Sequence, residues 1–342
     1  MRENYLGKLI MRNNNWQIIG HEWVIKSLRQ HVSGGNIKHA YLFTGPESVG
    51  KRTVAIRFAQ AVNCLNSTGN DVPCLDCKTC GQIERMVHPD LTIVKPGNTG
   101  GSLKVEQIRE FQYSLHLAPN NAVFRVAILL DFENATENAS NALLKTLEEP
   151  PDNVVILITA ENAERLLPTI ISRCEVIHLR PVPKDTLNAG IQNLWKISPE
   201  EADLLTQISG GRPGYCFNLY QSPELLEQRR KWIDDMNRLL ASNRIERFSY
   251  AEEVVKQRNQ LIPLLKTWLG FWRDVMLRSR DIDSQITNID YFESIDQLAQ
   301  NLQKDKTLQV VCLLDDTFYH LERNVNPRLA IEDLLLGLPF TS

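Results

Sequence analysis

Residues 44–53 read TGPESVGKRT, a stretch whose glycines and lysine could bind phosphate. In the pattern G-x-x-x-x-G-K-[ST], the glycines let backbone N–H groups curl around phosphate oxygens. The lysine reaches the outer phosphates, and the hydroxyl holds Mg²⁺. Three positions match this pattern: Gly45, Gly50 and Lys51. Arg52 stands at the hydroxyl position, and Thr53 comes one residue late, which on a helix is about 100° of rotation. We therefore expect a degenerate nucleotide site that binds ATP or ADP weakly and is poorly equipped to hold Mg²⁺.

A second set of chemical groups lies in ILLDFENAT. Asp131 ends an apolar run, at the place where a P-loop protein carries its metal-associated acid. Taken alone, Asp131 could equally be a solvated residue that caps a strand end. The next residue, where hydrolytic P-loop proteins place the glutamate that orients water, is Phe132. Glu133 follows, and in an extended segment a shift of one residue points its side chain to the other face. Because phenylalanine cannot activate water, we expect no ATP hydrolysis by the chain alone.

Four of the seven cysteines lie within one short stretch with the spacing C-x9-C-x2-C-x2-C: Cys64, Cys74, Cys77 and Cys80. In a reducing compartment this spacing predicts four thiolates that close tetrahedrally on Zn²⁺. A disulfide or an iron–sulfur cluster is the competing interpretation. Ordinary buried cysteines fit badly, because the segment has almost no apolar residues to surround them. Four protein ligands leave no open position for chemistry, so we expect a structural zinc module at 64–80.

Composition bounds the remaining function classes. The 342 residues allow two or three domains, and 43% hydrophobic with 23% charged residues is ordinary for a globular protein. A net charge of -3 provides no general attraction to DNA, so any nucleic-acid contact must come from a local patch or from partners. The longest apolar runs have the length of strands, and the first residues lack the apolar core of a secretory signal. We expect no membrane contact and a cytoplasmic protein.

Strands and helices must alternate to position these groups. Continuous apolar runs predict strands, and apolar residues at helical spacing predict helices, so the expected architecture is a parallel sheet covered on both faces. In such a sheet, ligands bind at the carboxyl ends of the strands. We expect strands at 39–44, 90–96, 125–131, 153–160 and 175–181, and helices at 51–62, 105–117, 135–151 and 166–174.

Beyond residue 181 the sequence predicts helices only. Three short helices are punctuated by proline and glycine, and longer helical stretches follow. The last helix is expected to begin at Asn326 with Pro327 at its first position. We predict an N-terminal extension at 1–15, an α/β P-loop domain at 16–181, a small helical lid at 182–221 and an all-α C-terminal domain at 222–342.

Five stretches together resemble the clamp-loader branch of the AAA+ proteins: HAYLFTGPESVGK, the four-cysteine insertion, NALLKTLEEPP, LLPTIISRC and NVNPRLAIEDLLL. The resemblance runs from about Trp16 to the C-terminus. It implies an AAA+-like domain, a lid, and a C-terminal collar that mediates oligomerisation. It also implies a hetero-pentameric ring, part of a DNA-directed DNA polymerase holoenzyme, that uses ATP at subunit interfaces in DNA replication. The implied partners are ATPase subunits, a clamp-opening delta subunit and, through the complex, a sliding clamp and primed DNA.

The same resemblance implies roles for individual residues. Arg173 matches the arginine that clamp-loader subunits project into a neighbour's ATP site, and guanidinium suits a phosphoryl group there. A local ion pair with a carboxylate is the alternative for Arg173. Cys174 is expected to be a packed core residue. Lys145 and Glu148 could face a neighbouring subunit or DNA. Arg212, in SGGRPG, lies near but out of register with the lid arginine that touches nucleotide in active ATPases.

Three functions from different classes remain. The first is a largely non-hydrolysing clamp-loader subunit that supplies Arg173 in trans, which the losses at Arg52 and Phe132 favour. The second is an active DNA-stimulated ATPase subunit of the same loader. The third is an unrelated zinc-stabilised nucleotide-binding protein with a role in signalling or transport.

Overall fold

The computed structural model describes residues 16–66, 72–97, 101–115, 122–282, 286–323 and 325–341. The predicted extension at 1–15 lies outside the described residues. The chain divides into two compact units. The first comprises the residues up to Ser198 together with Gly211–Tyr215, and the second comprises Pro199–Gly210 together with the residues from Cys216 onward. The finer division into an α/β domain, a lid and a collar stays a prediction.

A five-stranded parallel sheet forms the centre of the first unit, as the alternating pattern predicted. In chain order the strands are β1 (Ala40–Thr44), β2 (Leu91–Val94), β3 (Arg125–Leu129), β4 (Val154–Ala160) and β5 (Glu175–His178). Their order across the sheet is β2-β3-β4-β1-β5, and every neighbouring pair is parallel. Every residue of β1, β3 and β4 is buried, because helices cover both faces.

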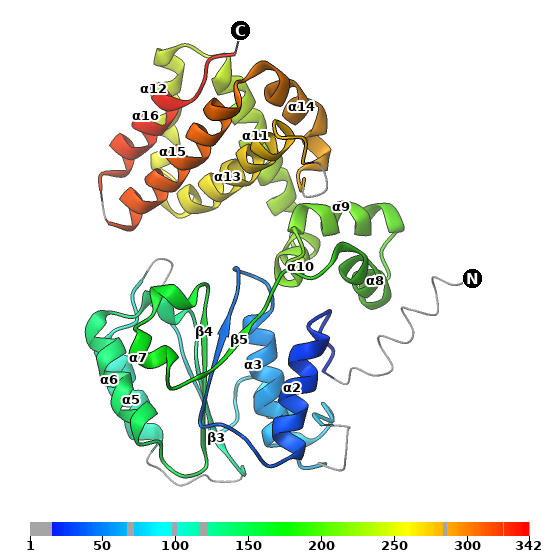
Figure 1. Cartoon of the computed structure of the whole chain (residues 1–342), viewed down its shortest axis with the longest axis vertical. Coiled ribbons are helices and arrows are strands. Elements are labelled where there is room, and N and C mark those ends of the chain that lie inside the picture. Colours follow the sequence, from blue (N-terminus) through cyan, green and yellow to red (C-terminus); the bar gives the residue numbers. More distant parts are fainter. Residues whose placement is uncertain are drawn as a thin grey trace. The chain divides into compact units, whose positions relative to one another are not determined.

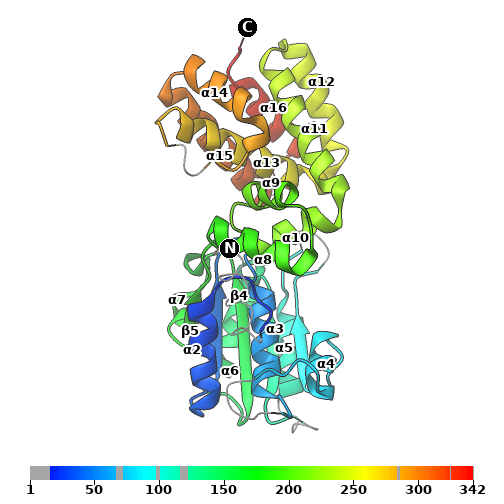
Figure 2. The same cartoon turned by 90° about the vertical axis from the view of Figure 1, so that its right-hand side faces the viewer.

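Helices pack on the two faces of this sheet (Figures 1 and 2). One face packs against α2 (Glu22–Ser33) and α3 (Lys51–Val62), together with Ile83 of α4 (Lys78–Glu84). The other face packs against α5 (Val105–Leu115), α6 (Glu137–Glu148) and the short α7 (Pro168–Ile171). Strand residues alternate between the two cores. Tyr41 and Phe43 therefore pack beneath α2 and α3, whereas Ala40 and Leu42 pack on the α5 and α6 side.

Short elements complete the first unit. Between β3 and α6 the chain forms a 3-10 turn, η1 (Phe132–Asn134), and η2 (Ala163–Arg165) follows β4. The Thr136 hydroxyl caps α6 by accepting from the Ala139 N–H, which satisfies one of the free donors at a helix start. Of the three short helices predicted after residue 181, α8 (Lys184–Trp195) lies in this unit. The helix α10 (Pro213–Gln221) begins in it and belongs to the second unit from Cys216 onward.

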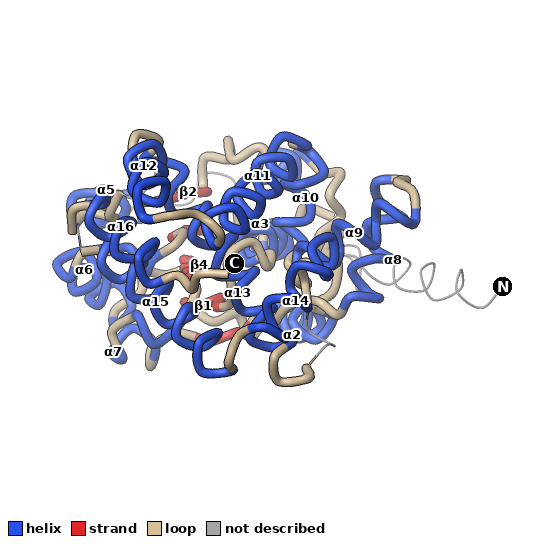
Figure 3. The backbone as a smooth tube through the Cα atoms, turned by 90° about the horizontal axis from the view of Figure 1, so that it is seen from above, coloured by secondary structure: helices blue, strands red, loops and turns tan. Residues whose placement is uncertain are grey.

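The second unit is built from helices, with no strand among its described residues (Figure 3). Its elements are α9 (Pro199–Ser209), α11 (Pro223–Leu240), α12 (Arg244–Val255), η3 (Arg258–Gln260), α13 (Leu261–Arg278), η4 (Ile289–Tyr291), α14 (Phe292–Asn301), α15 (Lys304–Glu322) and α16 (Pro327–Gly337). Trp268, Phe271 and Trp272 of α13 are fully buried in the core. Asn326 caps α16 and Pro327 opens it, as predicted.

No helix in the described part of the chain is both long and apolar enough to cross a membrane.

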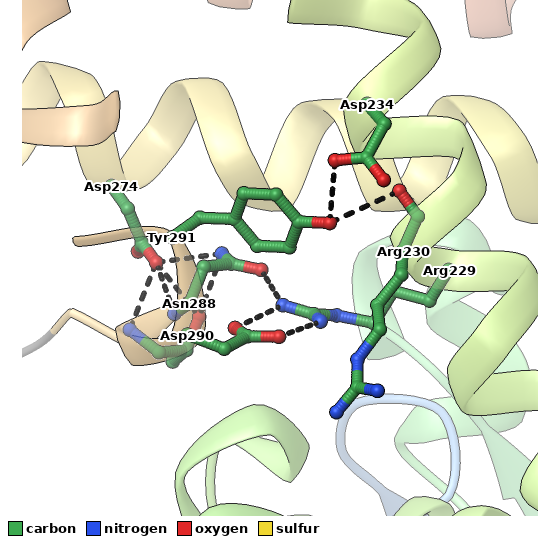
Figure 4. A network of polar contacts seen from close by, with 8 residues as sticks. Arg229, Arg230, Asp234, Asp274, Asn288, Asp290 and Tyr291 are labelled. Carbon is green, nitrogen blue, oxygen red and sulfur yellow. Dashed lines mark hydrogen bonds and ion pairs between the residues drawn. The ribbon is translucent and has the colours of Figure 1, made fainter. Parts of the chain in front are cut away.

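A buried polar network holds the turn before α14 in place (Figure 4). Asp274 Oδ2 accepts from the backbone N–H groups of Thr287 and Asn288, both at 2.8 Å, and from the Asn288 amide at 2.7 Å. Arg229 of α11 forms a bidentate pair with Asp290, at 2.6 and 3.0 Å. The network therefore joins α11 and α13 through η4, and its charges are paired, as burial requires.

A second buried arginine holds the C-terminal helix. Arg247 of α12 is only 6% exposed, and its guanidinium donates to five backbone carbonyls. The acceptors are Leu239 O (3.0 Å), Leu240 O (3.4 Å), Leu335 O (2.7 Å), Leu338 O (2.9 Å) and Pro339 O (3.1 Å). These carbonyls lie at the ends of α11 and α16, where the last carbonyls of a helix have no partner within it. One side chain therefore joins α11, α12 and α16.

We predict that Arg247→Met will destabilise this joint by about 2–4 kcal/mol, because it leaves buried carbonyls without donors while keeping the apolar stem. Hydrogen exchange of the α16 amides in the full-length protein measures the effect. Arg328→Met is the matched control, since Arg328 is an exposed arginine of α16 that pairs with Glu332. Exchange in Arg247→Met no faster than in this control would contradict the assignment.

Candidate functional site

The glycine loop follows β1 at the carboxyl edge of the sheet, as predicted. Gly45 has φ 146°, and a Cβ there would collide with the carbonyl oxygen of Leu179, which follows β5. Gly50 has φ 113° and immediately precedes α3. Both positions need glycine, because side chains strain the backbone at positive φ. The loop therefore keeps the backbone shape of a phosphate-binding loop at a helix N-terminus.

Lys51 turns back onto its own loop. Its Nζ donates to Gly45 O at 2.6 Å and to Pro46 O at 3.0 Å, and the residue is buried. Burial lowers the pKa of Lys51, and four nearby carboxylates oppose that shift: Glu161, Glu133, Asp131 and Glu47. The ammonium group is thus positioned among loop carbonyls and acids at the carboxyl edge.

The two residues after Lys51 lie on the exposed side of α3. Both Arg52 and Thr53 are exposed, whereas Lys51 is buried. Arg52 Nη2 lies 3.0 Å from Met86 Sδ, beyond the cysteine segment. This placement is the one expected from the sequence, because on a helix consecutive side chains point about 100° apart. Neither residue is placed with the ammonium of Lys51.

The prediction for Glu133 is wrong, and its premise of an extended backbone is the reason. The backbone of Asp131 adopts the left-handed helical conformation, with φ 50°, and residues 132–134 form η1. Phe132 consequently enters the core on the α5 and α6 side and is 1% exposed. Glu133 stays at the carboxyl edge, where its Oε1 accepts from the Glu161 N–H at 3.1 Å and its charge acts on Lys51. Burial raises the pKa of Glu133.

Two contacts of the loop carried no sequence signal. The Gly214 N–H at the start of α10 donates to Ser48 O at 2.8 Å, and His21 Nε2 contacts Val49 O at 3.0 Å. A Cβ on Gly214 would lie 2.8 Å from Ser48 O, so this approach also depends on a glycine. Arg212 stacks over the Tyr215 ring, 4.7 Å from its centroid. Backbone contacts between distant segments leave no residue pattern, which is why sequence reasoning missed them.

The four clustered cysteines come together. Their sulfur atoms all lie within 4.8 Å of one another, and none of them forms a disulfide. Tetrahedral zinc with Zn–S bonds of about 2.3 Å places sulfurs about 3.8 Å apart, so this donor set suits a four-coordinate metal. Backbone N–H groups donate to three of the sulfurs, as from Cys80 to Cys77 at 3.4 Å. Burial alone would raise the pKa of Cys77, but hydrogen bonds from backbone N–H groups and neighbouring thiols lower it to about 7.

The cysteine segment is attached to α3. Gln60 Nε2 donates to Cys80 O at 2.8 Å, and Arg57 pairs with Glu84 of α4. Trp16, fully buried, donates from Nε1 to Val72 O at 2.9 Å. The four-cysteine segment is therefore joined to the helix that begins at Lys51.

Arg173 lies after α7, away from the core. Its side chain is 33% exposed, and its Nη2 lies 2.7 Å from Glu148 Oε1. Its Nη1 donates to Thr169 O at 2.9 Å. Cys174 packs against the core between the sheet and α6, and burial raises its pKa to about 12, in agreement with a structural role. The chain thus presents a guanidinium that a neighbouring molecule could reach.

Comparison with known proteins agrees with the resemblance drawn from the motifs. The family model described as "DNA polymerase III, delta subunit" matches residues 20–183, and "DNA polymerase III, delta subunit, C terminal" matches residues 223–339. The chain is 33% identical over 178 residues to DNA polymerase III subunit tau of Escherichia coli (strain K12), covering 52% of this chain and 27% of that protein.

Two delta-prime subunits match over more of their length. The chain is 30% identical over 321 residues to the Bacillus subtilis (strain 168) protein "DNA polymerase III subunit delta'", covering 92% of this chain and 95% of that protein. It is 31% identical over 245 residues to the Pseudomonas aeruginosa delta-prime subunit, covering 70% of this chain and 72% of that protein. The chain therefore belongs to the delta-prime family of DNA polymerase III clamp-loader subunits.

Proposed function

We propose that this chain is a non-hydrolysing subunit of the loader that places a sliding clamp on primed DNA. It assembles with ATPase subunits and a clamp-opening delta subunit in a hetero-pentamer, in the cytoplasm at replication forks. Its contribution to ATP hydrolysis is Arg173, which completes a neighbour's active site. In isolation it is not an enzyme, although Gly45, Gly50, Lys51 and Asp131 form a degenerate site that binds nucleotide weakly. Thr53, which the sequence also assigned to this site, is exposed on α3 and does not contribute to it.

The proposal that the chain does not hydrolyse ATP rests on where the Phe132 side chain lies. Phe132 occupies the sequence position of the water-orienting glutamate, but its side chain is buried in the core on the α5 and α6 side of the sheet. A nucleotide bound at the carboxyl edge therefore could not reach it. Arg52 removes the hydroxyl that would hold Mg²⁺. Arg173, in contrast, is partly exposed and supplies a planar charge that suits phosphoryl oxygens.

One observation favours the second candidate, an active DNA-stimulated ATPase of the same loader. Glu133 lies on the same edge as Lys51, and its buried Oε2 has no hydrogen-bond partner within the part of the chain that the structure describes. A carboxylate there could orient water if Mg²⁺ and nucleotide bound productively. Arg52 provides no hydroxyl to hold Mg²⁺, which weighs against productive binding of Mg²⁺ and nucleotide.

We further propose that the cysteine cluster binds one structural zinc ion. Four sulfur ligands leave no open coordination position, and Zn²⁺ prefers such a set. Through Gln60, Arg57 and Trp16 the ion would also steady α3.

The zinc proposal predicts one metal ion per chain and its loss in Cys77→Ser. Structural zinc contributes roughly 10 to 16 kcal/mol of apparent binding free energy in small peptides, so its loss should loosen residues 64–80. The second unit should stay folded. Elemental analysis measures the metal, and limited proteolysis measures the loosening. Cys312→Ser, an exposed cysteine of α15, should keep the ion. Native protein purified without chelators and lacking zinc would contradict the proposal.

The degenerate-site proposal predicts negligible ATPase activity for the purified chain, with and without primed DNA. Lys51→Ala should abolish whatever weak nucleotide binding remains, measured by titration with a fluorescent ATP analogue. Restoring the acid by Phe132→Glu is not informative, because it would bury a carboxylate in the core. DNA-stimulated turnover that disappears in both Lys51→Ala and Glu133→Gln would establish the second candidate instead.

The arginine-finger proposal predicts that Arg173→Ala leaves the loader assembled but slows ATP hydrolysis and clamp loading. Such a residue contributes about 10³ to 10⁵ in rate in GTPases, and the whole ring will show less because its other interfaces keep their own arginines. ATP affinity should change little, since the finger acts on charge that develops in the transition state. Arg173→Lys should rescue little, because it lacks the planar fork. Wild-type loading by Arg173→Ala complexes at limiting ATP would show that Arg173 is only structural.

A further inference from the structure

We propose that Glu148 is the positioning residue for Arg173, holding its guanidinium in the direction that a neighbour's phosphate requires. This inference rests on the proposed function of Arg173. Two elements hold the guanidinium from two sides. Glu148, the last residue of α6, accepts from Nη2 at 2.7 Å. In α7, Thr169 O accepts from Nη1 at 2.9 Å, and Ser172 Oγ, at the end of this helix, lies 3.4 Å from the same nitrogen.

The core sets the spacing between the carboxylate and the guanidinium. Leu143 and Leu147 of α6 pack in the same buried cluster as Ile170 of α7. Because those apolar contacts fix α6 against α7, the residue after Leu147 and the segment after α7 keep a constant separation. Glu148 is thus the last residue of one packed helix, and Arg173 lies in the turn two residues after another, α7. Support from packed elements holds functional groups to a narrow range of positions.

Local helix energetics do not account for a glutamate at this position. The C-terminal end of a helix carries partial negative charge, so a carboxylate in its last turn is unfavourable by itself. The arginine offsets that repulsion. Solvent also reaches both side chains, with 33% of the arginine and 51% of the glutamate exposed, so the pair contributes little to the stability of the fold. The effect of the ion pair is to fix the direction of the long, flexible Arg173 side chain.

The arrangement leaves the guanidinium able to bind phosphate. A guanidinium has five N–H groups. Among the described residues, the contacts of Arg173 are those with Glu148, Thr169 and Ser172, which engage three of them. The remaining N–H groups are available to phosphoryl oxygens while Glu148 stays in place. Holding the side chain beforehand lowers the conformational entropy lost when the finger engages.

Steady-state ATP hydrolysis by the complete reconstituted loader tests this inference. The turnover that depends on the finger is the difference between wild-type and Arg173→Ala complexes. Glu148→Gln should reduce that turnover about two- to five-fold, the effect expected from an exposed ion pair. The change should be in kcat, with KM for ATP unaltered. Glu149→Gln is the matched control, because Glu149 is the adjacent exposed glutamate and removes the same charge. It should behave as wild type.

A double variant separates positioning from general charge effects. In complexes that carry Arg173→Ala, Glu148→Gln should cause no further loss, because there is no guanidinium to direct. Equal losses with and without Arg173, or equal losses from Glu148→Gln and Glu149→Gln, would overturn the inference. So would wild-type kcat in Glu148→Gln while Arg173→Ala is slow, and in that case the proposed function would stand. If Arg173→Ala itself has no effect, the proposed function fails, and this inference fails with it.

Discussion

The candidate nucleotide site depends on the contacts of one buried group, the ammonium of Lys51. It is buried at the carboxyl edge of the sheet, donates to the carbonyls of Gly45 and Pro46, and has four carboxylates around it. A buried cation is tolerable only with such partners. The parallel sheet supplies them, because β1, β3 and β4 all end at this edge and deliver Gly45, Asp131 and Glu161 together. A nucleotide phosphate would have to compete with the loop carbonyls for the same ammonium.

The helix that begins at Lys51 is held at both ends. Its first turn carries the loop, and its middle and last turns bind the cysteine segment through Arg57 and Gln60. Packing of Val54, Ala55 and Phe58 against the sheet fixes the helix between them. A metal ion bound by the four cysteines would therefore act on the position of the loop as well as on its own segment.

Arg173 and the glycine loop are placed by different parts of the same fold. The loop depends on the carboxyl edge and on glycine dihedral angles, whereas Arg173 depends on the packing of α7 against α6. A substitution in the loop, such as Arg52 at the hydroxyl position of the motif, therefore leaves the contacts that support Arg173 intact.

The sequence by itself determined the elements whose signals are local. Apolar runs predicted the five strands, and the cysteine spacing predicted that four sulfur atoms come together. Asn326 with Pro327 predicted the start of the last helix. Each of these features depends on neighbouring residues. Tertiary structure decided the rest. Alternation could not place Glu133, since Asp131 leaves the extended conformation and Phe132 enters the core instead. The contacts of Arg247, of Gly214 with Ser48, and of Glu148 with Arg173 join residues that are distant along the chain. Only packing of helices on the sheet and on one another brings such groups within hydrogen-bonding distance.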